Sequence, residues 1–217
     1  MALIIGVPQT FASLGDGNDA WVNTANIVDQ DNVNSTCATT TKNDTAQTLR
    51  CTNFNFPQFP RFSRVVGIVA AVWRSQSNNI NTTDNIIRLT LNGAALGQNR
   101  ATATRWPTTN TPIVYGVGET DLWGTTIGDT LISNGTIPPT FGIDIKPNVP
   151  GGQAGGTECR IDHVRIGLYV VINNMLVRVN SAWQPVIDPR TRVGNVDTNI
   201  PQAYVRLNNA WQTVHLD

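Results

Sequence analysis

Residues 160–172, RIDHVRIGLYVVI, carry the clearest strand pattern in the chain. From Val164 onward every second residue is aliphatic, and the residues between them, with His163, are assigned to the opposite face. This period of two is typical of a half-buried strand, whereas a helix would scatter the same residues around its circumference. Glycine-rich residues 151–156 precede the stretch and two asparagines follow it, as turn residues do. We therefore predict a strand here, with its aliphatic face in a core.

The composition indicates strands joined by loops. The 217 residues include 27 Thr and 24 Asn but only two Lys and two Glu, so the strong surface helix formers are nearly missing. Only 14% of residues are charged and the formal net charge is zero, so no positive field attracts phosphate backbones or anionic membranes. The apolar N-terminal stretch is too short to span a membrane. We expect neither nucleic acid binding nor membrane insertion.

Residues 65–73, VVGIVAAVW, are apolar on both faces. A strand of this kind is typical of the centre of a sheet, so we predict that it is covered on both sides and pairs with residues 160–172. The chain length suits one all-β domain with an appendage. We place an N-terminal arm at residues 1–20, a β-sandwich at 21–174 and a C-terminal arm at 175–217.

Shorter patterns predict the other strands of the sandwich. Asn92-Gly93 follows an alternating stretch and is a strong hairpin signal. Residues 33–46 are polar, rich in Thr and without periodicity, so we predict a surface loop there. The further strands are predicted at residues 48–53, 86–91, 94–99 and 141–145.

Cysteine and acidic residues give no sign of a metal site or cofactor. The three cysteines, Cys37, Cys51 and Cys159, form no C-x-x-C pair, and we predict free thiols in a protein made in a reducing cytoplasm. A bridge between Cys37 and Cys51 stays open if a hairpin brings them together. Residues 16–31 hold four Asp but lack the ligand spacing and closing Glu of a calcium loop, so we predict turns there, with an ion as the alternative.

The sequence offers little that points to catalysis. His163 and His215 are far apart, and Asp144 and Asp162 form a carboxylate pair only if their strands are neighbours, which is a weak hint of glycosidase chemistry. We expect no enzyme activity. Aromatic residues beside turn residues favour plugs at the ends of a sandwich, with a sugar-stacking platform as the alternative. These aromatic residues are Trp106, Tyr115 and Trp123.

A set of spaced aromatic and glycine positions resembles a module of tailed-bacteriophage virion proteins. The resemblance covers about residues 20–172 and rests on punctuation, not on a catalytic signature. It implies a jelly-roll-like β-sandwich with a structural role on the tail, a fibre or the capsid. The positions are Trp21, Asn23, Asn26, Asp31, the strand that begins at Val65, LTLNGAALGQNRA, Trp106, VYG, DLWG, FGIDI and RIDHVRIGLYVV.

The C-terminal arm contains an internal repeat. Residues 176–186, LVRVNSAWQPV, and residues 204–214, YVRLNNAWQTV, are identical at seven of eleven positions. Each copy has a short strand, an Asn-containing turn and a returning Trp, which is the pattern of a small β-hairpin. Similar hairpins end many phage tail proteins, and this weaker resemblance covers only the arm. The predicted assembly residues are Val177, Arg178, Trp183, Val205, Arg206 and Trp211.

Together these patterns predict a non-enzymatic structural component of a tailed-phage virion, assembled in the host cytoplasm and associated with the tail or a fibre. Its expected partners are itself, as a homotrimer, and other virion proteins. A capsid decoration protein is one alternative. A module that binds a host-surface glycan through Trp106, Tyr115 or Trp123 is the other.

Overall fold

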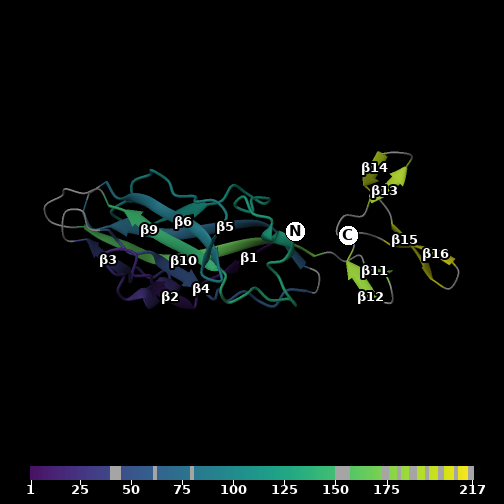
Figure 1. Cartoon of the computed structure of the whole chain (residues 1–217), viewed down its shortest axis with the longest axis horizontal. Coiled ribbons are helices and arrows are strands. Elements are labelled where there is room, and N and C mark those ends of the chain that lie inside the picture. Colours follow the sequence, from purple (N-terminus) through teal and green to yellow (C-terminus); the bar gives the residue numbers. More distant parts are fainter. Residues whose placement is uncertain are drawn as a thin grey trace.

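The alternating stretch forms most of β10 (Thr157–Ile172), the longest strand of the computed structural model (Figure 1). The structure describes residues 1–39, 45–60, 63–78, 81–149 and 157–172 and, beyond residue 172, the backbone of six short strands. Val164, Ile166 and Leu168 are completely buried, as predicted for the aliphatic face of the strand. Ile172 is 44% exposed because the strand extends beyond the buried core at that end.

β10 is the organising strand of a five-stranded antiparallel sheet, which we call sheet A. From Cys159 to Ile172 it pairs with β5 (Ser63–Gln76), with a bulge at Asp162, which confirms the predicted partnership. Its other side pairs with two strands end to end: β3 (Ser35–Thr39) along the first half and β1 (Ala2–Gly6) along the second. The fifth strand, β8 (Thr111–Tyr115), pairs with the far side of β5.

The second antiparallel sheet, sheet B, has the order β2-β4-β9-β6-β7. In it Asn92 (φ 52°) and Gly93 (φ 79°) join β6 and β7, and two positive φ angles in a row are those of the predicted tight hairpin turn. The bounds are β2 (Thr10–Ser13), β4 (Leu49–Thr52), β6 (Thr83–Leu91), β7 (Ala94–Leu96) and β9 (Gly142–Asn148).

The two sheets bury one apolar core between them. Ile68 and Ile166 of sheet A and Leu89 and Ile143 of sheet B are all fully buried members of this core. Between β1 and β10 the chain crosses from one sheet to the other at every step except β6 to β7. Most ladders therefore join strands that are distant in sequence, a topology typical of slow-folding β-sandwiches.

The structure differs from the sequence-based prediction near the N-terminus. Residues 1–20, expected to form an arm, contribute β1 to sheet A and β2 to sheet B. Residues 33–46, expected to form a loop, contain β3. These segments lack a strand pattern of their own. They are strands because their backbones pair with neighbouring strands of the sheet. Two 3-10 helices, η1 (Thr24–Val28) and η2 (Ile127–Asp129), complete the described sandwich.

Beyond residue 172 the described backbone consists of strands that pair in successive twos. β11 (Leu176–Val179) pairs with β12 (Ala182–Pro185), and β15 (Ala203–Leu207) pairs with β16 (Ala210–Val214). Between them, in the stretch that separates the two repeat copies, β13 (Arg190–Val193) pairs with β14 (Val196–Asn199). The side chains of this part of the chain lie outside the described residues.

Candidate functional site

The three aromatic residues proposed as a sugar platform lie inside the sandwich. Trp106 is 1% exposed, Tyr115 is 3% exposed and Trp123 is fully buried. Both indole N–H groups have protein acceptors: Trp106 Nε1 donates to Asp84 Oδ1 at 2.9 Å, and Trp123 Nε1 donates to the Ile68 carbonyl at 2.8 Å. A sugar ring has no exposed face to stack on at these positions, and the geometry is that of plugs.

Trp106 and Tyr115 enclose a buried ion pair between the sheets. Arg74 on β5 and Asp84 on β6 are paired with both side chains completely buried. The Arg74 guanidinium lies 5.2 Å from the Trp106 ring centroid and 5.8 Å from that of Tyr115. Asp84 also accepts hydrogen bonds from Tyr115 Oη at 2.9 Å and from the backbone and side chain of Thr102 at 3.1 and 3.0 Å.

Asp84, Arg74, Trp106, Tyr115 and Thr102 form what we call the Asp84 cluster. Burial lowers the pKa of Arg74, although the neighbouring Tyr115 acts in the opposite direction. Burial also raises the pKa of Tyr115 to about 12, so the phenol keeps its proton at neutral pH and remains a donor to Asp84. Five donor groups are directed at the Asp84 carboxylate, and through Arg74 and Tyr115 of sheet A they link the two sheets.

Trp123 is held by a neighbouring carboxylate in the DLWG turn. Asp121 accepts hydrogen bonds from the backbone N–H groups of Trp123 and Val117, both at 2.8 Å, and from Arg100 Nη2 at 2.7 and 2.9 Å. Trp123 has a φ of 57°, a left-handed conformation that is costly for a bulky residue. The hydrogen bonds of Asp121 therefore stabilise a turn that inserts the indole ring into the core.

The two acids considered as a catalytic pair lie in different sheets. Asp144 is on β9 of sheet B, where Arg50 on the adjacent β4 donates two hydrogen bonds to it at 2.7 and 2.8 Å. Asp162 is on β10 of sheet A, at a bulge where β5 offers it no partner residue. It is 1% exposed, and burial raises the pKa of its carboxyl group. These acids do not face one another across a substrate site.

The cysteines are free, buried thiols, as the sequence predicted. Cys37 and Cys51 lie in different sheets, so no hairpin brings them together. Cys37 is instead directly opposite Cys159 in the β3–β10 ladder. Burial raises the pKa of the Cys37 thiol to about 12, and it also raises those of Cys51 and Cys159, so none is a reactive thiolate at neutral pH.

In the stretch considered as an ion-binding loop, residues 16–31, the Asp16 carboxylate already has partners from β9 and the residue before β4. Asp16 accepts from the backbone N–H and hydroxyl of Thr48, both at 2.7 Å, and from Lys146 Nζ at 3.1 Å. Burial alone would raise the pKa of Asp16, but these hydrogen bonds outweigh it and lower the pKa overall. Within the described ranges, no group of three or more His, Cys, Asp or Glu side chains is arranged to hold a metal ion.

His163 lies on the outer face of sheet A, where η1 covers it. The imidazole Nδ1 is 3.1 Å from the Ile27 carbonyl, and Arg165 Nε donates to Nε2 at 2.6 Å. Because Nε2 accepts a hydrogen bond, the ring is neutral with its proton on Nδ1, and it donates that proton to Ile27. The ring also packs edge-on against Trp73 at 5.1 Å between centroids.

We expect protonation of His163 to destabilise the sandwich. Burial and the neighbouring Arg165 lower its pKa, while the carbonyls of Ile27 and Val28 and the charge of Asp29 only partly oppose them. The unfolded chain therefore takes up a proton first, so stability should be intact above about pH 6.5 and decline as the pH falls below it. The melting temperature of the wild type should drop between pH 7.5 and 5.

A His163→Gln variant supplies the control for this pH dependence. It should be less stable than the wild type at pH 7.5 because it lacks the fitted imidazole, but the gap in melting temperature should narrow toward pH 5. The difference between the two proteins cancels other titrating groups, including the nearby Asp162. A gap that stays constant from pH 7.5 to 5 would show that His163 does not titrate in this way.

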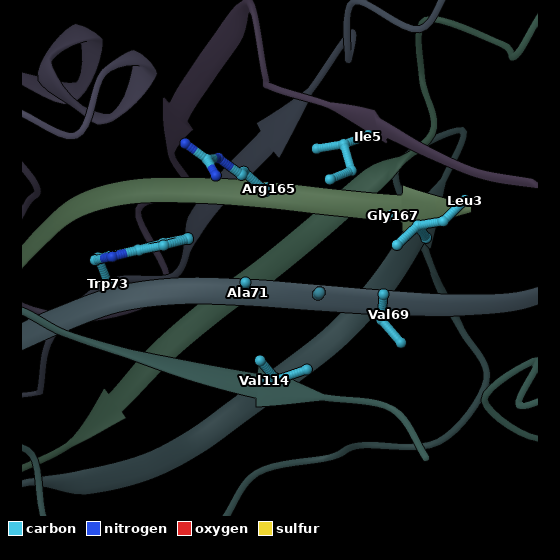
Figure 2. Close-up of a pocket in the computed structure, with 9 residues that line it drawn as sticks. Leu3, Ile5, Val69, Ala71, Trp73, Val114, Arg165 and Gly167 are labelled. Atoms are coloured by element: carbon cyan, nitrogen blue, oxygen red, sulfur yellow. The ribbon is translucent and has the colours of Figure 1, made fainter. Parts of the chain in front are cut away.

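The remaining half of the same outer face is open and apolar. Side chains of β1, β5, β8 and β10 form a groove of about 230 Å³ there. Figure 2 shows the residues that line it. Leu3 is 46% exposed, Ile5 is 54% exposed and Val114 is 63% exposed. The full lining is Leu3, Ile5, Val69, Ala70, Ala71, Trp73, Val114, Arg165 and Gly167.

The floor of this groove depends on small residues in the two central strands. Gly167 lies opposite Ile5 on one side and Val69 on the other. A Cβ atom at Gly167 would approach Val69 Cγ2 to 2.9 Å and Leu3 Cδ1 to 3.0 Å, so glycine keeps the depression open. Arg165 forms one rim, with its guanidinium carbon 5.0 Å from the Trp73 ring centroid. We call this feature the sheet A groove and take it as the candidate functional site.

Sequence reasoning assigned no role to these groove residues, although a signal was present. The stretch VVGIVAAVW predicted a strand covered on both faces. The structure covers the inner face, where Ile68 and Val72 are completely buried, but leaves Val69 and Ala71 of the outer face partly exposed. The prediction of two-sided cover is therefore wrong for the described part of a single chain.

The structure places the predicted assembly residues only at the level of backbone pairing. Arg178 lies opposite Trp183 in the β11–β12 ladder, and Arg206 lies opposite Trp211 in the β15–β16 ladder, so the two repeat copies have the same register. Val177 and Val205 precede these arginines. The contacts of their side chains lie outside the described residues.

Comparison with known proteins gives no family assignment. No family model, curated protein or solved structure matches the chain. A search of the described residues for a helix long and apolar enough to cross a membrane finds none.

Proposed function

We propose that this protein is a non-enzymatic structural component of a tailed-phage virion, associated with the tail or a fibre. In this proposal the sandwich is a rigid body of jelly-roll-like topology, and residues 175–217 form an assembly arm with two tryptophan hairpins. The repeated crossing of the chain between the two sheets supports the jelly-roll-like description. The spaced aromatic and glycine positions of the sequence support the assignment to virion proteins.

The observation that carries the proposal is the contrast between the interior and the outer face of sheet A. Three of the acidic side chains are paired with arginines: Asp84 with Arg74 in the interior, and Asp144 with Arg50 and Asp121 with Arg100 in partly buried positions. The open part of the outer face is apolar, which favours burial against protein over binding of a polar substrate. A protein whose charged side chains pair with one another and whose exposed sheet face is apolar is suited to assembly with other proteins.

The two alternatives are a capsid decoration protein and a glycan-binding module. A capsid decoration protein would use the same rigid body on a lattice of capsomers, whereas a fibre component favours coaxial threefold stacking. The glycan-binding alternative lacks support from the positions named for it, because the rings of Trp106, Tyr115 and Trp123 are buried. For a fibre component with threefold symmetry, the partners that we propose are two further copies of the chain, in a homotrimer, and other virion proteins.

Two measurements test this function. Light scattering coupled to size exclusion should show that the purified full chain is a stable trimer at micromolar concentration. In lysates of the producing host, antibody against the sandwich should decorate phage tails or fibres in negative-stain images. Antibody found only on capsids would move the protein to the decoration class. A monomeric chain that labels no particle would contradict the proposal.

A further inference from the structure

The outer face of sheet A is covered at one end and open at the other. At the covered end, η1 packs on β10, where His163 is 2% exposed and Ile27 is completely buried. At the open end, Leu3, Ile5 and Val114 each leave about half of the residue in water. Among the residues that the structure describes, therefore, η1 covers one half of this face and no element covers the sheet A groove.

The size of the open surface limits what can cover it. Three aliphatic side chains at about half exposure present roughly 300 Å² of apolar surface, at the lower end of the range for the largest patch on a monomer. A stable face-to-face interface needs about 800 Å² from each partner. The groove alone is therefore too small for two sandwiches to associate through it. It fits a small element that inserts one large side chain, since a Trp buries roughly 150–250 Å².

The lining of the groove is suited to an aromatic ring. Gly167 and Ala71 form a shallow floor between the aliphatic walls of Leu3, Ile5 and Val114 (Figure 2). Arg165 supplies a cation at the rim, already placed next to the Trp73 ring. An indole ring suits such a surface for two reasons. It buries a large apolar area, and the negative face of its π system attracts a nearby guanidinium.

The chain itself contains the matching element in two copies. Each C-terminal repeat pairs a Trp strand with an Arg strand in the same register, Trp183 with Arg178 and Trp211 with Arg206. A two-stranded hairpin is too small to bury its own Trp. Each chain carries two such hairpins and one sheet A groove, and in the proposed self-associating assembly a hairpin of one subunit can reach the groove of its neighbour.

We infer that the sheet A groove is the docking site for a tryptophan hairpin from the C-terminal arm of a second copy of this chain. The inference rests on the proposed function and adds the contact through which the subunits associate. Trp183 or Trp211 of one subunit inserts over Gly167 of the next, against the aliphatic walls and beside Arg165. Two hairpins on each arm allow one subunit to engage two neighbours.

A photo-crosslinking experiment on the full chain tests this contact. Benzoylphenylalanine replaces Val114, which is 63% exposed and so tolerates the change. Unlabelled and nitrogen-15-labelled proteins are mixed, allowed to exchange subunits and irradiated. Mass spectrometry should find position 114 joined to residues 176–186 or 204–214 of the other isotope. Crosslinks confined to one isotope, crosslinks to the sandwich of the other copy, or no crosslinks would each overturn the inference.

A matched pair of variants tests the energetics. Val114→Lys places a charge in the groove and should raise the dissociation constant of self-association about tenfold or more, as changes at central interface residues do. Val33→Lys is the control, because Val33 is 52% exposed and does not line the groove. Sedimentation velocity should show no effect for the control. Equal dissociation constants for Val114→Lys and the wild type would overturn the inference.

The outcomes separate this inference from the proposed function. If the full chain forms a stable oligomer that Val114→Lys leaves intact, the groove is not the docking site, but the assembly role stands. If the full chain is monomeric and labels no particle, the proposed function fails and the docking site fails with it.

Discussion

Replacing Asp84 by alanine should lower the free energy of unfolding by about 3–5 kcal/mol, which is a large part of the stability of a domain of this size. The substitution leaves the buried Arg74 without its counter-ion and removes the acceptor of Trp106 Nε1 and Tyr115 Oη. A buried charge without a partner is much more costly than the loss of the pair itself. Urea denaturation followed by tryptophan fluorescence measures the change.

Asp129→Ala is the matched control for this substitution. Asp129 also pairs with an arginine, Arg64, but at 3.8 Å and with 61% of its own side chain exposed. Its removal should change the free energy of unfolding by no more than about 0.5 kcal/mol, as is usual for exposed pairs. If Asp84→Ala lowers the free energy of unfolding as little as Asp129→Ala does, the Asp84 cluster does not hold the two sheets together.

The strands with strong period-two patterns were predictable because their burial is one-sided and local in sequence. β10, β6 and the Asn92-Gly93 turn follow from side-chain alternation and turn chemistry alone. The pairing of β5 with β10 was also predictable, because two long apolar strands in one domain are natural neighbours. Their place in one sheet needed no knowledge of the shorter strands.

The strands that were missed depend on partners far away in the sequence. β3 consists of Ser, Thr, Cys and Ala and becomes a strand only against the first half of β10. β8 contains Pro112, which local rules place outside a strand, and it is tolerated because β8 lies at the edge of sheet A. Such segments take their order from the sheet that they complete, so periodicity within them carries little information.

The candidate site was only partly visible in the sequence, for a related reason. Alternation shows that a strand has two faces, but not what covers each of them. The apolar outer residues of β5 indicated a cover, yet only the structure shows that η1 reaches His163 and leaves the surface around Gly167 open. The burial of Trp106 and Trp123 likewise depends on Asp84 and Asp121, whose positions follow from the packed fold.

Truncation after Asn174 should leave a folded protein of near-native melting temperature that no longer forms the native oligomer. Every member of the buried core that the structure describes lies at or before Val170, so the sandwich keeps its packing without residues 175–217. The repeated tryptophans, in contrast, each have roughly 150–250 Å² to bury, worth about 4–6 kcal/mol before ordering costs are subtracted. Removing the arm therefore removes this burial free energy from the oligomer.

The size of the loss distinguishes an assembly arm from a core element. Losing even about 4 kcal/mol of contact energy weakens association about a thousandfold, so the truncated chain should sediment as a monomer at concentrations where the full chain is an oligomer. Trp183→Ala combined with Trp211→Ala should give a milder defect, because the hairpin backbones and their Arg strands remain. Circular dichroism should show the same β-rich spectrum for all three proteins. If the truncated chain does not fold, the arm completes the core and its assignment to assembly is wrong.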